Sequence, residues 1–146
     1  MNYPTGIGTD IQANDNSIME SLTYILVINS GSSSIKFQLL AMPAEQHLID
    51  GQMEQIGSAD AILIYKVRDS IPLERSVPAP DHATALSAIF NLLEEQQSKS
   101  HLSPPDVVSH RVVHGGNEFA APVLINEDVI TRLEKVSKLA PFHNTA

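Results

Sequence analysis

Five stretches in the first half of the chain have the hydrophobic pattern of β-strands. Residues 24–28 are continuously apolar and β-branched, which is typical of a strand covered on both faces. Residues 35–40 alternate apolar with polar positions, which predicts one buried face. Three further strands are expected at residues 47–53, 61–67 and 73–77, with turn-forming residues between them. The chain is therefore predicted to open with a β-meander whose first two strands form a hairpin.

A change to helical spacing follows residue 80. Asp81 is suited to cap a helix N-terminus, and the helix is expected to end near Ser98. Its inward face is predicted to consist of Ala83, Leu86, Ile89, Phe90 and Leu93. A second helix is expected after Asn126, because two acidic residues occupy its first turn. Its inward residues are predicted to be Val129, Ile130, Leu133 and Val136.

Two more strands complete the predicted fold. Residues 107–113 read as a buried strand, and residues 122–125 read as a short strand before the second helix. Antiparallel strands followed by a helix, a strand and a helix predict an α/β domain with a mixed β-sheet. Residues 1–20 lack an apolar period and are expected to be a disordered N-terminal extension, with Met19 as an alternative start.

The amino-acid composition of the chain argues against several classes of function. The 146 residues are 42% hydrophobic, which predicts a packed globular domain. The net charge of -8 and the scattered basic residues argue against binding to nucleic acid or to an anionic membrane. The chain contains no cysteine, which excludes thiol chemistry and agrees with a reducing compartment. Because no apolar run approaches the length of a bilayer span, a cytoplasmic protein is expected.

The turn between the first two strands is the first candidate site. It reads Asn-Ser-Gly-Ser-Ser-Ser over residues 29–34 and is followed closely by Lys36. Small residues leave backbone N–H groups free to face one anion, and hydroxyls and an ammonium add donors. The segment lacks the spacing of a Walker P-loop and continues as a strand. A phosphate cradle and a plain hairpin turn both remain open on this evidence.

The second and third candidates lie near residues 110 and 143. Arg111 follows a predicted buried strand, so its guanidinium needs an anionic partner from the protein or a ligand, and a carboxylate suits its geometry. His110 and His114 share strand parity, but two histidines alone make a weak metal site, and a structural role is favoured. His143 stands alone in a predicted loop, where a histidine is usually structural or exposed.

Together, three segments resemble the acetate kinase family, including its propionate and butyrate kinase relatives. They are ILVINSGSSSIKF at residues 25–37, HRVVHGG at 110–116 and APFHN at 140–144. The resemblance implies a ribonuclease H-like domain of the acetate and sugar kinase, heat-shock chaperone and actin superfamily, over residues 21–146. It also implies reversible, Mg2+-dependent phosphoryl transfer from ATP to acetate, giving acetyl phosphate and ADP. A homodimer is expected for the full-length enzyme.

The resemblance assigns roles to individual residues. Asn29 would help to hold Mg2+, and Ser32, Ser34 and Lys36 would lie along the ATP phosphates. Arg111 would bind the carboxylate or acyl phosphate, Val113 and Phe142 would line the acyl pocket, and His143 would stand near the transferring phosphoryl group. Arg111 and His143 are thus the catalytic candidates.

Departures from the family qualify these expectations. The family's catalytic aspartate, second histidine, second arginine, metal-binding glutamate and adenosine pocket are expected beyond the last residue, so the domain is expected to be truncated and inactive alone. Phe142 stands at a position where family members often have leucine, and its bulkier ring favours a small acyl group such as acetate. The alternatives are a propionate kinase fragment, and a non-catalytic module that binds phosphate, nucleotide or a partner chain.

Overall fold

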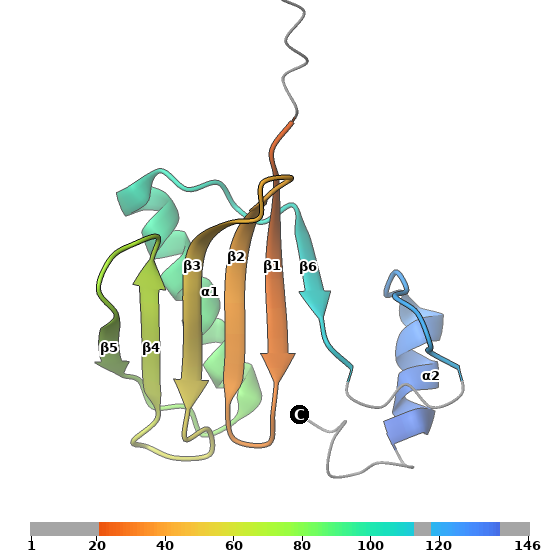
Figure 1. Ribbon diagram of the computed structural model, residues 1–146. Helices are drawn as coiled ribbons and strands as arrows, with labels where there is room; N and C mark the ends of the chain where they lie inside the picture. The colour runs from red at the N-terminus through yellow and green to blue at the C-terminus, as the bar shows by residue number, and fades with distance from the viewer. Residues whose placement is uncertain (1–20, 113–117, 138–146) are drawn as a thin grey trace, which may run out of the picture.

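A single mixed β-sheet forms the centre of the molecule. The structure is a computed structural model that describes residues 21–112 and 118–137. The strand order is β5-β4-β3-β2-β1-β6 (Figure 1). The strands are β1 (Thr23–Ser30), β2 (Ile35–Met42), β3 (Gln46–Glu54), β4 (Ile62–Val67), β5 (Leu73–Ser76) and β6 (Val107–His110). The helices of the described residues are α1 (His82–Ser100) and α2 (Glu127–Ser137).

The connections between strands confirm the predicted meander. Strands β1 to β5 pair antiparallel with their neighbours in sequence, and Ser30 lies opposite Ile35 across the β1–β2 turn. Strand β6 pairs parallel with β1 after the crossover through α1, which makes the sheet mixed. The fold class predicted from the sequence is therefore confirmed. The predicted extension at residues 1–20 lies outside the described residues.

The core lies between α1 and one face of the sheet, called here the covered face (Figure 1). Strand residues on this face have almost no exposed surface, and include Leu26, Ile28, Ile35, Phe37, Leu39, Ile49, Met53, Leu63 and Tyr65. In β3 the covered face contains Gly51, which lies opposite Phe37 in the register. A Cβ at position 51 would lie 2.3 Å from Cζ of Phe37. The phenyl ring therefore occupies the space that a side chain at this position would need.

Helix α1 begins where the sequence predicted, and its predicted inward face is confirmed in part: Ile89 and Leu93 are buried, and Leu86 packs partly buried against the core. The Asp81 side chain accepts a hydrogen bond from the Thr84 N–H at 2.7 Å, as an N-cap does. The buried residues are Ala85, Ile89, Leu92, Leu93 and Gln96. Ala83 and Phe90 are exposed, so their predicted inward position was wrong. Each helical residue is turned about 100° from the previous one, which carries Phe90 away from the stripe centred on Ile89.

An ion-pair network joins β5 to α1 at the edge of the core. The Arg75 guanidinium donates to both carboxylate oxygens of Glu95, at 2.7 and 3.0 Å. Lys99 pairs with the same carboxylate one helical turn further on. Hydrogen bonds from Arg75 and then from Lys99 lower the pKa of Glu95 to about 2, well below its ordinary 4.5. The guanidinium also lies over the ring of Tyr65, 5.1 Å from its centre.

The second half of the chain differs from the prediction in three ways. All four residues of β6 are exposed and the strand ends at His110, because β6 is an edge strand beyond the reach of α1. Residues 122–125 are exposed and form no strand. Helix α2 has the predicted Asn126 cap, whose side-chain oxygen accepts from the Val129 N–H at 2.9 Å. Val129 and Val136 are buried as predicted, but Ile130 is 48% exposed.

The opposite side of the sheet, called here the open face, has no described element packed on it (Figure 1). The prediction that β1 is covered on both faces is therefore wrong for the described part of the chain. Ile25 and Val27 on this side are only partly buried, whereas Leu26 and Ile28 are buried. Neither described helix is long and apolar enough to cross a membrane.

Candidate functional site

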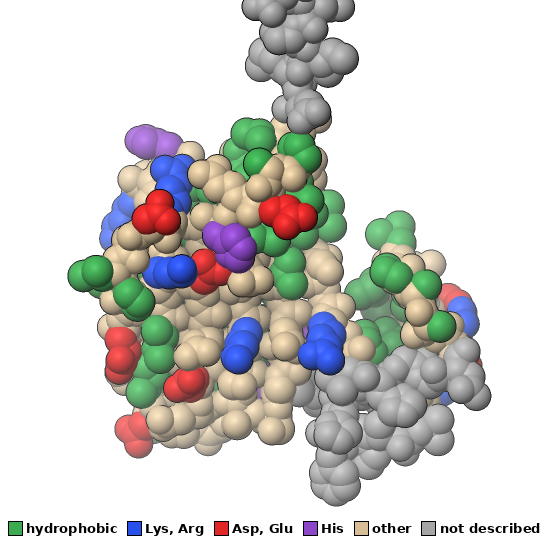
Figure 2. Space-filling view, viewed as in Figure 1, with side chains coloured by type: hydrophobic (Ala, Val, Ile, Leu, Met, Phe, Trp, Pro, Cys, Tyr) green, Lys and Arg blue, Asp and Glu red, His purple; other side chains and the backbone are tan. Residues whose placement is uncertain are grey.

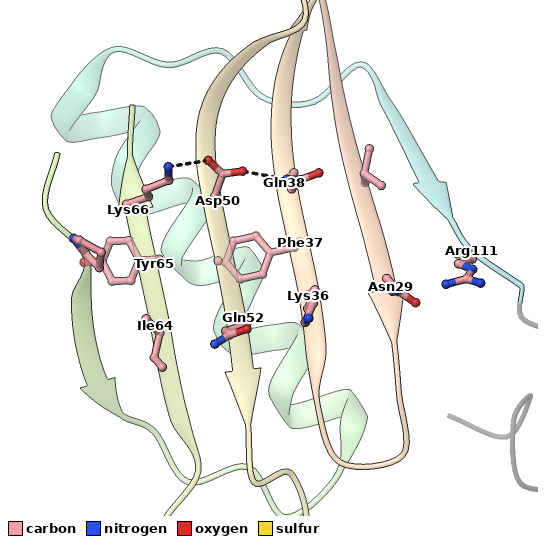
Figure 3. A pocket seen from close by; sticks show the side chains of 13 residues that line it. Asn29, Lys36, Phe37, Gln38, Asp50, Gln52, Ile64, Tyr65, Lys66 and Arg111 are labelled. Atoms are coloured by element: carbon pink, nitrogen blue, oxygen red, sulfur yellow. Dashed lines mark hydrogen bonds and ion pairs between the residues drawn. The ribbon is translucent and has the colours of Figure 1, made fainter. Parts of the chain in front are cut away.

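A shallow hollow of about 550 Å³ lies on the open face of the sheet, a volume in the range of small-molecule sites (Figure 3). Side chains from β1 to β4 and the residue after β6 form its lining. The ionic members are Lys36, Lys66, Arg111 and Asp50. Figure 2 views this side directly and shows separate basic side chains over the lower half of the sheet, with no acidic side chain between them. In a chain of net charge -8, this excess of cations marks the hollow as a place for an anion.

Three residues predicted from two separate motifs lie in one row across the open face. Lys36 of β2 lies directly opposite Asn29 of β1 in the antiparallel register. On the other side, Ile28 is level with His110 of β6, and the Arg111 N–H donates to the Ile28 carbonyl at 3.1 Å. Arg111 therefore emerges beside Asn29 on the same face (Figure 3). With strands about 4.8 Å apart, the Cα atoms of Lys36 and Arg111 lie about 10 Å apart.

Arg111 is an exposed residue at the edge of the hollow. No carboxylate within the described ranges forms an ion pair with it, unlike Arg75 and Arg132. The sequence predicted an anionic partner from the protein or from a ligand. Within residues 21–112 and 118–137, the protein supplies none, and the fork geometry of a guanidinium suits a planar anion such as a carboxylate.

The β1–β2 turn is closed by one internal hydrogen bond and held to the body of the protein through two of its carbonyl groups. Inside the turn, the Gly31 N–H donates to the Ser34 carbonyl at 2.7 Å, and from outside it the Ile56 N–H donates to the Ser33 carbonyl at 3.0 Å. A ring nitrogen of His82, the first residue of α1, lies 2.7 Å from the Gly31 carbonyl oxygen. Among the described residues, the N–H groups of Ser32, Ser33 and Ser34 have no acceptor. Three N–H groups without a partner in the described part of the chain suit the binding of an anion at this end of the sheet.

A second row of polar side chains crosses the open face above the first. Asp50 accepts hydrogen bonds from His47 at 2.7 Å and from Gln38 at 2.9 Å, and Lys66 lies 3.6 Å away (Figure 3). Burial raises the pKa of Asp50, but the hydrogen bonds from His47 and Gln38 and the nearby cations outweigh it, so the pKa is lowered. The carboxylate is thus ionised and already paired. Sequence analysis missed this row, because alternating polar residues on a strand usually indicate only a solvated face.

The described residues fit a magnesium ion only in a limited way. No group of three His, Asp or Glu side chains in the described part of the chain could hold a metal. Asn29 offers one amide oxygen at the hollow, and Asp50 is committed to its neighbours. Mg2+ commonly keeps several waters and takes oxygens from substrate phosphates. Asn29 is therefore suited to be a single protein ligand, directly or through water, beside a bound phosphate.

The remaining predicted site residues are distributed unevenly. Ser32 and Ser34 lie in the turn that leads into the Asn29–Lys36 pair, with Ser32 exposed. His110 is exposed at the end of β6, on the side of the sheet opposite to Arg111. Val113, His114, Phe142 and His143 lie outside the described residues. The structure thus brings together Asn29, Lys36 and Arg111 from the first two motifs.

Comparisons with known proteins agree on one group. The model of the acetokinase family matches residues 24–146. The chain is 46% identical over 125 residues to an acetate kinase of Thermotoga petrophila, covering 84% of this chain and 30% of that protein. Among solved structures, Porphyromonas gingivalis acetate kinase matches with a TM-score of 0.77 and 34% identity, over 85% of this chain and 32% of that one. A Francisella tularensis propionate kinase matches with a TM-score of 0.72 and 30% identity, over 85% and 31%. The chain therefore spans about a third of the length of these relatives.

Proposed function

The chain belongs to the acetokinase family, and from that premise we propose that it contributes the acyl-binding and phosphate-facing side of an ATP:acetate phosphotransferase. The observation that supports this best is the row of Lys36, Asn29 and Arg111 on the open face. It sets an ammonium and a guanidinium at either side of an amide, next to a turn with free N–H groups. Such a row suits two anions that must be held close together.

The proposed reaction is reversible phosphoryl transfer from ATP to acetate. A carboxylate oxygen attacks the γ-phosphorus in line, the bond to the β-phosphate oxygen breaks, and acetyl phosphate and ADP result. Because acetate is ionised at pH 7, the attacking oxygen needs no general base. The protein's task is to bring two anions together and to offset charge on the equatorial oxygens.

Each described residue of the row has a place in this proposal. Arg111 binds the acetate carboxylate through its two-pronged guanidinium. Lys36 lies along the ATP phosphates, together with Ser32 and Ser34 of the turn. Asn29, between Lys36 and Arg111 in the row, takes part in holding Mg2+, which when bound neutralises phosphate charge.

Three further roles rest on family resemblance and fall outside the described residues. Val113 and Phe142 line the pocket for the acyl methyl group, and His143 stands near the transferring phosphoryl group. The activity itself is proposed for the whole protein, in which we also expect a homodimer. Acetate, acetyl phosphate and ATP are the proposed small-molecule partners.

Replacing Arg111 tests the proposal in the whole protein. Arg111→Ala should raise the Michaelis constant for acetate by about tenfold or more, as expected for the loss of a hydrogen-bonded charge pair, and should lower kcat. Arg68→Ala is the matched control, because Arg68 is an exposed arginine in the turn between β4 and β5 that does not line the hollow. An unchanged acetate constant in Arg111→Ala would remove this residue from the acyl site. A whole protein without acetate-dependent ADP formation would overturn the proposed activity.

Propionate phosphorylation is the second candidate, because the similar Francisella tularensis structure is a propionate kinase. The ratio of kcat/KM for acetate, propionate and butyrate decides between them. One methylene changes such a ratio by roughly 10- to 200-fold in a hydrophobic pocket. A higher value for acetate than for propionate supports the first proposal, and the reverse order supports the second.

A further inference from the structure

The β1–β2 turn is tied to helix α1 by one side chain. His82 Nε2 lies 2.7 Å from the Gly31 carbonyl oxygen, although 51 positions separate the residues in sequence. A carbonyl oxygen only accepts hydrogen bonds, so Nε2 must carry the proton. The other ties of the turn are made by the backbone N–H groups of Gly31 and Ile56. His82 is therefore the one side-chain tie to the turn's carbonyl groups within the described residues.

The direction of this carbonyl determines the direction of the next N–H. In a trans peptide unit, the C=O of one residue and the N–H of the following residue point in opposite directions in one plane. Holding the Gly31 carbonyl toward His82 thus turns the Ser32 N–H away from α1. The bond from Ile56 to the Ser33 carbonyl orients the Ser34 N–H in the same way. Two of the three free N–H groups of the turn are therefore oriented by contacts behind it.

We propose that His82 is a positioning residue that keeps the Gly31–Ser32 peptide in the orientation needed to bind the phosphates of ATP. This inference rests on the proposed function, and it adds a residue that none of the three motifs contains. His82 acts from behind the turn and does not contact the phosphate. Its loss should weaken ATP binding and leave acetate binding intact, because Arg111 is held by its own bond to β1.

The test compares four forms of the whole protein: wild type, His82→Ala, His82→Gln and Asp81→Ala. In His82→Ala we expect the Michaelis constant and the dissociation constant for ATP to rise about tenfold, the size expected when one hydrogen bond to a charged group is loosened. The acetate constant should change less than twofold. His82→Gln should restore ATP binding, because its amide nitrogen can take the place of Nε2.

Asp81→Ala is the control for damage to the helix end. It removes the cap on the Thr84 N–H and leaves the His82 contact in place. Asp81→Ala should lower the melting temperature by a few degrees and leave the Michaelis constants for ATP and acetate unchanged. Unchanged ATP constants in His82→Ala would overturn the inference, and so would equal rises in both constants with no rescue by glutamine. ATP binding is measured by calorimetry as well as by turnover. A wild-type protein that binds ATP but does not transfer phosphate would refute the proposed activity, and the role of His82 in ATP binding would still be tested by calorimetry.

Discussion

Replacing Gly51 by alanine is the sharpest test of the packing between β2 and β3. The added Cβ would lie 2.3 Å from Cζ and 2.7 Å from Cε1 of Phe37, and 3.0 Å from the Ile64 carbonyl oxygen. The two distances to the Phe37 ring are shorter than Cβ contacts in real proteins, and the distance to the Ile64 oxygen is at the lower limit. Phe37 is 1% exposed and packed in the core, so its ring cannot swing into solvent.

The expected cost follows from two opposing terms. Overpacking a well-filled core costs about 1–3 kcal/mol. Replacing glycine in a strand by alanine recovers about 0.5–1 kcal/mol of backbone entropy. The net effect of Gly51→Ala is therefore a loss of about 1–2 kcal/mol in the free energy of unfolding. For a chain of this size, that corresponds to a fall in melting temperature of roughly 2–8 °C.

Urea unfolding followed by circular dichroism measures this loss, and Gly31→Ala is the matched control. At position 31 a Cβ would meet only Ser34 atoms at 3.5 Å, an ordinary contact, so its stability should stay within about 0.5 kcal/mol of wild type. Phe37→Leu combined with Gly51→Ala should be more stable than the sum of the single changes, because the shorter side chain relieves the overlap. A Gly51→Ala chain as stable as wild type would refute the reasoning.

Two further predictions concern charged groups. Because the pKa of Glu95 is lowered to about 2 from 4.5, its ion pairs stabilise the fold above pH 4.5, and this contribution is lost as the pH falls toward 2. Glu95→Gln should lower stability at pH 6 and flatten the acid slope in urea titrations, whereas parallel curves would contradict this. Lys36→Ala should raise the Michaelis constant of the whole protein for ATP several-fold. Lys99→Ala, whose ammonium pairs with Glu95 on helix α1 and does not line the hollow, should leave this constant unchanged, and equal effects would contradict the assignment.

Much of the fold could be predicted because its signals are local. The apolar run of β1 and the alternation in β2 each lie within one strand, and in both strands alternate residues are buried on the covered face. Asp81 and Asn126 cap their helices through hydrogen bonds to residues three positions away. The turn of glycine and serine residues that joins β1 and β2 could also be predicted, because the two strands it connects are neighbours in sequence.

Features that depend on distant partners could not be predicted. The face of α1 is chosen by the sheet behind it, so Phe90 is exposed although its spacing fits a helical stripe. The apolar sequence of β6 suggested burial, but its place at the sheet edge leaves Val108 52% exposed. The contact between His82 and Gly31 spans 51 positions and leaves no pattern in either segment. For the candidate site, the sequence identified Asn29, Lys36 and Arg111, while their shared row required the strand register.

The row of Lys36, Asn29 and Arg111 has a mechanical consequence. Lys36 and Asn29 stand on the paired strands β2 and β1, and Arg111 directly follows β6 and is bonded through its N–H to Ile28 of β1. The interval between the ammonium and guanidinium stems is therefore set by backbone hydrogen bonds. Changing that interval would require breaking the ladder, and a slip of one residue would turn the side chains to the covered face. The two cationic stems therefore keep their separation whether or not an anion is bound. Any approach of one bound anion toward the other must come from the reach of the side chains and from elements outside these strands.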